Sequence, residues 1–167
     1  EMISTTPSTA EMSKHLINAT LATCTALGNE LGDLAARASA DPIEAALLAK
    51  RDPRLARLPI VPGLPVGGGT LARDLRLVAT MAGPSSLAQA VVDSGDARYR
   101  SMLESLRRSD GPSALLGLTY KPGTSATRRS IGVSLAHDLA TGGAAVRVFD
   151  ADVPSADNPL KDVPGVS

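Results

Sequence analysis

The sequence has little of the chemistry that cross-links small proteins or binds metals. Its 167 residues include one cysteine, Cys24, and two histidines, His15 and His137. A single thiol excludes an internal disulfide and any site built from several thiolates, and it leaves Cys24 as the one candidate thiol nucleophile. The histidines lie far apart in the sequence without flanking acidic clusters, so we expect no bound metal.

Net charge and long apolar segments are absent as well. Seventeen basic residues balance seventeen acidic ones, so the chain as a whole lacks the field that would attract nucleic acid or an anionic membrane surface. Its apolar runs are short, whereas a membrane span needs about 20 apolar residues. With 43% hydrophobic residues the chain still has enough apolar surface for a packed core. We therefore expect a cytoplasmic globular protein that binds neither nucleic acid nor membrane.

Residues 1–109 predict an all-helical domain. Between about residues 10 and 37, apolar side chains recur every three or four positions and polar side chains occupy the opposite face, which is the pattern of a long amphipathic helix. The apolar positions are Met12, Leu16, Cys24, Leu27, Leu31 and Leu34, and the polar ones are Glu11, Lys14, Asn18, Thr25 and Asn29. Asp41 predicts the cap of a second helix, and two more helices are expected over about residues 70–82 and 85–108.

Residues 110–167 predict the beginning of a parallel α/β domain. Short apolar segments at 114–118 and 145–149 have the length and composition of buried strands, and residues 128–140 between them predict a helix. Strand, helix and strand in this order form one right-handed βαβ unit. The expected fold is a helical domain followed by a partial α/β domain.

Lys14 and Asn18 form the first candidate site. They lie one turn apart on the predicted long helix, so a lysine charge and an amide donor reach the same reacting centre, where both stabilise a developing oxyanion. The alternative is an ordinary solvated helix face, on which Glu11 and Lys14 form a weak surface pair.

The segment PGLPVGGGTLARD, residues 62–74, forms the second candidate site. Gly67 and Gly68 allow the backbone to approach a ligand closely, and the helix expected from Thr70 directs free N–H groups toward whatever binds there. The segment is not a Walker loop, because no Gly-Lys-Ser/Thr follows, and it is not a dinucleotide fingerprint, because no strand precedes it. The alternative is an ordinary loop that ends in an N-cap threonine.

The segment LGLTYKPGTSATRRS, residues 116–130, runs from the first predicted strand into the following helix. Lys121 and Arg128 flank the carboxyl end of that strand, where open α/β sheets bind ligands. The alternative is a pair of solvated basic side chains.

These three segments, followed by VRVFD at residues 146–150, resemble in order and spacing the UDP-glucose, UDP-N-acetylmannosamine and GDP-mannose dehydrogenases. The resemblance implies that residues 1–109 correspond to a helical central domain, which forms a homodimer through the long helix. Residues 110–167 would be the start of a Rossmann-like C-terminal domain that binds the nucleotide sugar. The NAD-binding domain of such enzymes would precede Glu1, so we expect the chain to be a piece of a longer, NAD-dependent protein.

The resemblance also implies roles for individual residues. Family members oxidise the C6 alcohol of a nucleotide sugar to a carboxylate in two NAD-dependent steps, and a cysteine carries the intermediates. Lys14 and Asn18 match the lysine and asparagine that stabilise the oxyanion, and Asp74 matches an aspartate that works with a water. By the same matching, the substrate-binding residues are Gly67, Gly68, Lys121 and Arg128.

Thr70 stands at the position of the family's catalytic cysteine. A thiol with an ordinary pKa of about 8.5 ionises readily at a helix N-terminus, whereas a threonine hydroxyl is too weak an acid and needs an adjacent base. Cys24 is no substitute, because about 15 Å of helix separates it from Lys14. Smaller departures from the family pattern occur at Gly69, Arg73, Ser125 and Ala126.

Three interpretations follow from these residues. The first is an NAD-linked enzyme that acts on a nucleotide-activated sugar with altered chemistry, such as one oxidation that stops at the aldehyde. The second is a non-catalytic relative that binds a nucleotide sugar or serves assembly, and the third is a helical interaction module without a ligand. We prefer the first because Lys14, Asn18 and Asp74 are all present.

Overall fold

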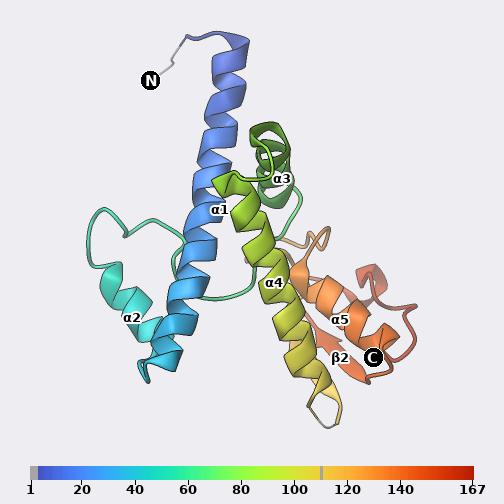
Figure 1. Cartoon of the computed structure of the whole chain (residues 1–167). Coiled ribbons are helices and arrows are strands. Elements are labelled where there is room, and N and C mark those ends of the chain that lie inside the picture. The colour runs from blue at the N-terminus through green and yellow to red at the C-terminus, as the bar shows by residue number, and fades with distance from the viewer. Residues whose placement is uncertain (1–3, 110) are drawn as a thin grey trace. The chain divides into compact units, whose positions relative to one another are not determined.

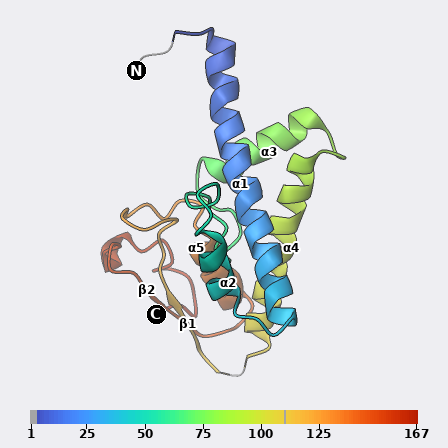
Figure 2. The same cartoon turned by 90° about the vertical axis from the view of Figure 1, so that its left-hand side faces the viewer.

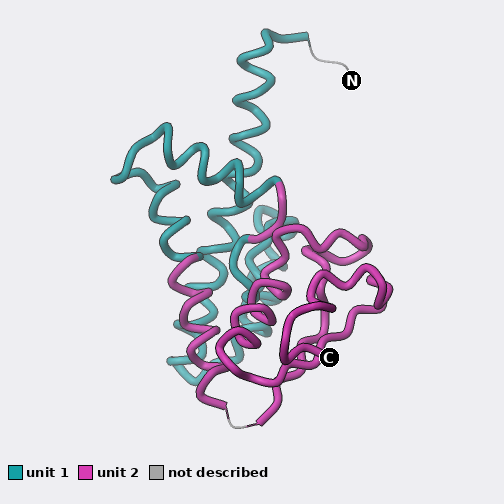
Figure 3. The backbone as a smooth tube through the Cα atoms, turned by 90° about the vertical axis from the view of Figure 1, so that its right-hand side faces the viewer, with its two compact units in different colours: residues 1–66, 70–95 teal, residues 67–69, 96–167 magenta. Residues whose placement is uncertain are grey.

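The computed structural model describes residues 4–109 and 111–167, which form two compact units (Figure 1, Figure 3). The first unit holds the residues up to Val66 together with Thr70–Gly95, and the second holds Gly67–Gly69 together with Asp96–Ser167. The glycine segment therefore belongs to the second unit, although its neighbours on both sides in the sequence belong to the first.

Four helices make up the N-terminal part of the chain. They are α1 (Pro7–Arg37), α2 (Pro42–Ala49), α3 (Leu71–Ala82) and α4 (Leu87–Arg107). The hydroxyl of Thr6 caps α1 by accepting a hydrogen bond from the Thr9 N–H at 3.2 Å. The carboxylate of Asp41 caps α2 by accepting from two backbone N–H groups. The four helices expected from the sequence are confirmed, with ends that shift by a few residues.

The division between the two units falls within α4. The first unit ends at Gly95 and the second begins at Asp96, yet the helix continues through this point without interruption. The sequence places its domain boundary later, near residue 110, where turn residues precede the first strand. One half of α4 thus packs with each unit.

The helix α1 buries part of the face that its sequence marks as polar, including Asn18 and Asn29. Its buried residues are Asn18, Ala22, Ala26, Gly28, Asn29 and Gly32. α3 packs across this face (Figure 2), and the core of the first unit joins α1 to α3 and α4 through Ala22, Ala26, Leu75, Ala79, Val91 and Val92. The alternative of a solvated polar face is therefore wrong for Asn18 and Asn29, because both make hydrogen bonds inside the unit.

The apolar face of α1 is exposed instead. The side chains at its apolar positions Met12, Leu16, Leu27, Leu31 and Leu34 are 49–69% exposed. Small residues on the buried face explain this arrangement, because alanine and glycine allow neighbouring segments to approach more closely than leucine would. These large apolar side chains of α1 are therefore only partly covered by the described chain.

The second unit contains the expected βαβ arrangement, which is confirmed. β1 (Ser113–Leu116) pairs in parallel with β2 (Val146–Phe149), with Ser113 opposite Val146 (Figure 2). The helix α5 (Ile131–Thr141) connects the strands, and a short 3-10 helix, η1 (Ser155–Asp157), follows. The core of this unit consists of Leu103, Leu118, Leu135, Ala136, Leu139, Ala140, Val146, Val153 and Leu160.

The helix α5 begins three residues later than its pattern predicts. Arg129 has a φ of +58°, which a right-handed helix does not accommodate, and Ser130 is the N-cap. A Cβ on Gly132 would lie 2.7 Å from the carbonyl oxygen of Gly117. The first turn of α5 therefore packs directly on the end of β1, and Arg128 lies in the loop before the helix.

Candidate functional site

A buried carboxylate lies at the centre of the first unit's polar contacts. Asp74, on α3, is 3% exposed. Its Oδ2 accepts a hydrogen bond of 2.6 Å from the side-chain amide of Asn18 on α1, and its Oδ1 accepts bonds of 3.1 and 3.0 Å from Nε and Nη2 of Arg73. His15 approaches from α1, with Nδ1 3.9 Å from Oδ2. We call His15, Asn18, Arg73 and Asp74 the carboxylate cluster.

The cluster keeps Asp74 ionised. The hydrogen bond from Asn18 is the largest cause that holds the pKa of Asp74 below its ordinary value, and the hydrogen bond from Arg73 is the next, while burial acts in the opposite direction. The carboxylate is therefore an anion at neutral pH, fixed by one neutral and one cationic donor.

Acid should destabilise the first unit through Asp74. Because the pKa of Asp74 is lower in the folded chain than its unfolded value of about 3.9, its contribution to stability is present above that value and is lost as the pH falls through the folded pKa. We expect the free energy of unfolding of the parent chain to fall as the pH is lowered from 5 to 3. The fall should exceed that of Asp74→Asn by up to about 1.4 kcal/mol per pH unit. Urea titrations of both proteins at the two pH values measure this difference, and equal losses would contradict it.

Thr70 and Lys14 each lie four residues before a member of this cluster, Thr70 before Asp74 and Lys14 before Asn18. Thr70 occupies the N-cap position of α3, one turn before Asp74, with an exposed side chain that accepts no capping hydrogen bond from the described residues. Its carbonyl accepts the Asp74 N–H at 2.9 Å. The alternative of an ordinary capping threonine is thus not supported, because such a cap requires the hydroxyl to accept a backbone N–H. Lys14 is exposed on α1, one turn before Asn18.

The glycine segment is held by the loop before α5. The N–H of Gly68 donates to the carbonyl of Arg129 at 2.8 Å, and Nη1 of Arg129 donates to the carbonyl of Gly69 at 3.1 Å. Gly68 has a φ of +83°, and a Cβ at this position would lie 2.7 Å from the Tyr120 ring. Only glycine satisfies both conditions, so Gly68 is where the backbone passes against an aromatic side chain.

Lys121 and Arg128 belong to the same unit as Gly67 and Gly68. Both basic side chains are exposed. The ammonium of Lys121 lies 5.6 Å from the centroid of the Tyr120 ring, within the range of a cation–π contact. The predicted substrate-binding residues thus lie in the second unit, and the predicted reactive residues Lys14, Asn18, Thr70 and Asp74 lie in the first.

Asp150 organises the carboxyl ends of the two strands. Its Oδ2 accepts hydrogen bonds from the backbone N–H groups of Leu118 at 2.6 Å and Thr119 at 2.9 Å. These bonds, with Leu118 as the first cause, hold the pKa of Asp150 below its ordinary value. The loop that follows β1 is thereby fixed to the end of β2, at the edge where parallel sheets bind ligands.

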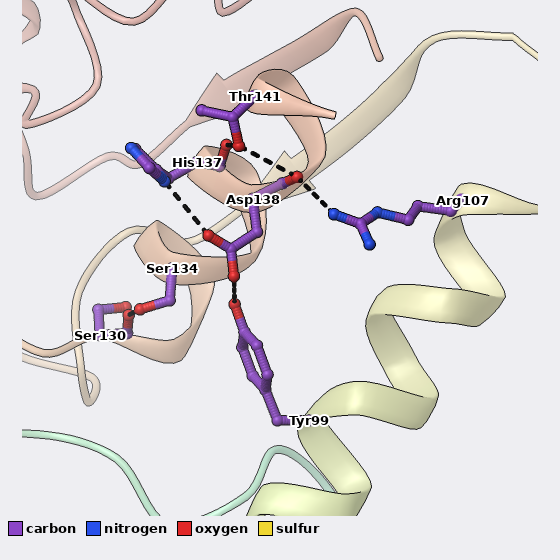
Figure 4. Close-up of polar contacts among 7 residues, drawn as sticks. All are labelled: Tyr99, Arg107, Ser130, Ser134, His137, Asp138 and Thr141. Atoms are coloured by element: carbon purple, nitrogen blue, oxygen red, sulfur yellow. Dashed lines mark hydrogen bonds and ion pairs between the residues drawn. The ribbon is translucent and has the colours of Figure 1, made fainter. Parts of the chain in front are cut away.

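A second polar network joins α4 to α5 inside the second unit (Figure 4). The hydroxyl of Tyr99 donates to Asp138 at 2.7 Å, and Nη2 of Arg107 donates to the carbonyl of Asp138 at 3.1 Å. Burial and the hydrogen bond with Asp138 raise the pKa of Tyr99, so the phenol stays protonated and remains a donor. The network fixes the C-terminal half of α4 to α5.

Sequence reasoning missed several of these residues. His15 lies three positions before Asn18, a spacing that places both on one helix face, but a lone histidine gave no signal for a metal or a triad. Arg129 follows Arg128 directly, and its left-handed backbone cannot be read from residue type. Asp150 carried a usable signal, because it ends a predicted strand at the ligand-binding edge of the sheet.

Residues 4–109 and 111–167 contain neither a cluster of metal-ligating side chains nor a helix suited to crossing a membrane. No group of three or more histidine, cysteine, aspartate or glutamate side chains in this part of the chain is arranged to hold a metal ion. Within the same residues, no helix combines the length and apolar character that crossing a membrane requires.

Comparison with protein families gives two matches. Residues 8–97 match the central domain of the UDP-glucose/GDP-mannose dehydrogenase family, and residues 114–164 match the UDP binding domain of the same family. The chain is 32% identical over 157 residues to the UDP-glucose 6-dehydrogenase of Haloferax volcanii, covering 89% of this chain and 36% of that protein. It is 30% identical over 154 residues to a GDP-mannose 6-dehydrogenase of Pseudomonas syringae, covering 88% of this chain and 35% of that protein.

Solved structures of similar fold carry related names. A UDP-glucose dehydrogenase from Pyrobaculum islandicum superposes with a TM-score of 0.81 at 28% identity, covering 96% of this chain and 40% of that one. A UDP-D-ManNAc dehydrogenase from Pyrococcus horikoshii gives a TM-score of 0.71 at 30% identity, with 95% and 40% covered. This chain spans about a third of the length of the curated relatives it matches. Since the central-domain match alone covers more than half of the residues, the chain belongs to the UDP-glucose/GDP-mannose dehydrogenase family.

Proposed function

We propose that this chain is the central and sugar-binding part of an NAD-dependent dehydrogenase that oxidises a nucleotide-activated sugar. The observation that carries the proposal is the buried 2.6 Å hydrogen bond between Asn18 and Asp74. It fixes one donor and one carboxylate next to the start of α3, where Thr70 stands. A merely solvated helix face would leave these groups exposed.

In this proposal each of the predicted site residues takes part in binding or catalysis. The ammonium of Lys14 and the amide of Asn18 stabilise negative charge on the sugar oxygen that loses its proton. Asp74 is held as an anion and orients a water. Lys121, Arg128, Gly67 and Gly68 are the residues proposed to bind the substrate, the two basic side chains through its phosphates. NAD supplies the hydride acceptor, and none of the residues described is proposed to hold it.

Thr70 limits the chemistry of the proposed site. A second oxidation, from aldehyde to acid, needs a nucleophile that holds the aldehyde carbon, and an unassisted threonine hydroxyl stays protonated. We therefore propose one oxidation that releases an aldehyde. The alternative is a non-catalytic nucleotide-sugar-binding relative, which predicts binding without turnover.

The stoichiometry of NADH tests the proposal. The full-length protein is incubated with NAD and a panel of UDP- and GDP-hexoses, and NADH is measured by absorbance while the product is identified by mass spectrometry. One NADH per sugar with an aldehyde product is the expected result. Binding by calorimetry without NADH would favour the non-catalytic alternative, and the absence of both would remove the assignment of a nucleotide-sugar substrate.

The exposed apolar face of α1 supports a homodimer as a second element of the proposal. Its five large side chains, Met12, Leu16, Leu27, Leu31 and Leu34, are about half exposed or more. Several large apolar side chains exposed on one helix face are typical of protein–protein interfaces. A second copy of the same helix offers a self-complementary apolar partner.

Leu31→Glu should therefore shift the protein from dimer to monomer. A buried glutamate on each side of a two-fold interface places like charges in an apolar contact, so we expect the dissociation constant to rise by about a hundredfold or more. Sedimentation velocity over a concentration series measures the change. Met81→Glu is the matched control, because Met81 is 69% exposed on α3 rather than on α1. A parent protein that sediments as a monomer at all concentrations would contradict the dimer.

A further inference from the structure

His15 is the one member of the carboxylate cluster whose hydrogen bonding is incomplete. Its Nδ1 is buried without a hydrogen-bond partner among the described residues, and it lies 3.9 Å from Oδ2 of Asp74. The side chain as a whole is 23% exposed. The exposed part of the side chain therefore does not include Nδ1.

The carboxylate has room for this donor. Oδ2 accepts one hydrogen bond, from Asn18, and a carboxylate oxygen accepts two. Shortening the distance from 3.9 Å to a normal hydrogen bond takes a movement of about 1 Å. Because an ionised carboxylate only accepts, a bond between the two groups requires the proton to be on Nδ1. The Nε2 lone pair is then left free.

We propose that His15 and Asp74 form a proton-accepting dyad, in which Nδ1–H donates to Asp74 and Nε2 takes a proton from a hydroxyl group of the bound substrate. The O–H bond breaks with its electron pair left on oxygen, the Nε2–H bond forms, and Asp74 stabilises the resulting imidazolium. This inference rests on the proposed function and assigns the group that removes the proton from the substrate hydroxyl.

The charged neighbours of the dyad are compatible with this role. Arg73 binds the other carboxylate oxygen, Oδ1, and leaves Oδ2 to Asn18 and His15. Lys14 precedes His15 on the same helix and is exposed, so its ammonium is available to stabilise the alkoxide that proton transfer creates.

The first test is the tautomer of His15, read from 15N chemical shifts of the full-length protein at a pH where the ring is neutral. His15→Gln and His137→Gln each remove the signals of one histidine, so the two variants together assign the signals of both residues. His137 is the internal reference, because its Nδ1 lies 3.2 Å from Asp138 on the protein surface. A proton on Nδ1 of His15 is the expected result, and a proton on Nε2 would overturn the dyad. Neither outcome depends on turnover.

The second test is the pH profile of kcat/KM for His15→Asn. The asparagine amide takes the place of Nδ1 as a donor to Asp74 but has no proton-accepting nitrogen. We expect an unchanged unfolding midpoint, a loss of about a hundredfold in kcat/KM, and the disappearance of the fall on the acid side of the profile. His137→Gln should leave the profile unchanged. An unaltered profile in His15→Asn would overturn the role of Nε2. A parent protein without any turnover would overturn the proposed function, and the tautomer of His15 would then decide whether the dyad exists.

Discussion

Thr70→Cys should convert a single oxidation into a double one. The new thiol stands at the N-terminus of α3, where free N–H groups and the positive end of the helix favour the thiolate. A thiolate adds to the aldehyde carbon to give a thiohemiacetal. Loss of a hydride to a second NAD would convert it to a thioester, which water hydrolyses to the carboxylate and the free thiol. We expect the carboxylate product to form at least about a hundredfold faster than in the parent protein. The measured NADH should rise from one to two per sugar.

The matched control for this prediction is Thr70→Ser, which keeps a hydroxyl of similar acidity. It should release the aldehyde with one NADH, as the parent does. Acid formation by the parent or by Thr70→Ser at the rate of Thr70→Cys would show that the hydroxyl is already an adequate nucleophile. The assignment of Thr70 as the limiting residue would then be wrong.

The periodic features of this sequence predicted its secondary structure well. Apolar spacing and cap residues located α1 to α4, and the change of period after residue 110 located the βαβ unit. Local patterns suffice here because side chains cap the starts of α1, α2 and α5, and glycines follow α3 and β1. The start of α5 was misplaced because Arg129 has a left-handed backbone and hydrogen bonds to the glycine segment, neither of which residue type reveals.

The sequence could not show which face of α1 is buried. The rule that large apolar residues are buried holds when a chain covers its own core, and here Leu27 and Leu31 are exposed whereas Asn18 and Asn29 are buried. Asn29 is satisfied by the N–H of Gly63 at 2.8 Å, a residue 34 positions away that no local pattern connects to it. The burial of such an amide can be predicted only when its distant hydrogen-bond partner is known.

The candidate site was predicted in part for the same reason. Asn18 and Asp74 were singled out by their residue types and by the family resemblance, but the bond between them depends on how α3 packs across α1. His15 remained unnoticed because a single histidine on a helix has no partner until Asp74 is brought to it. Chemistry-bearing residues are visible in a sequence, whereas their pairing is a property of the packing.

Gly28→Ala should strongly destabilise the first unit. Gly28 lies in the middle of α1, where a Cβ would be 2.5 Å from the carbonyl oxygen of Ile60 and 2.7 Å from its Cα. Both neighbours are backbone atoms, so the segment after α2 must move away from α1. We expect a loss of about 3 kcal/mol in the free energy of unfolding, measured by urea denaturation.

Gly95→Ala is the matched control with the opposite expected sign. Gly95 also lies inside a helix, α4, but a Cβ there would meet only the Pro65 side chain at 3.9 Å, an ordinary contact. Alanine should stabilise the helix by about 0.5–1 kcal/mol. If both substitutions stabilised the protein, helix propensity alone would explain the results. The close approach of residue 60 to α1 would then be contradicted. Opposite signs would place that contact at Gly28, because intrinsic helix propensity favours alanine at both positions.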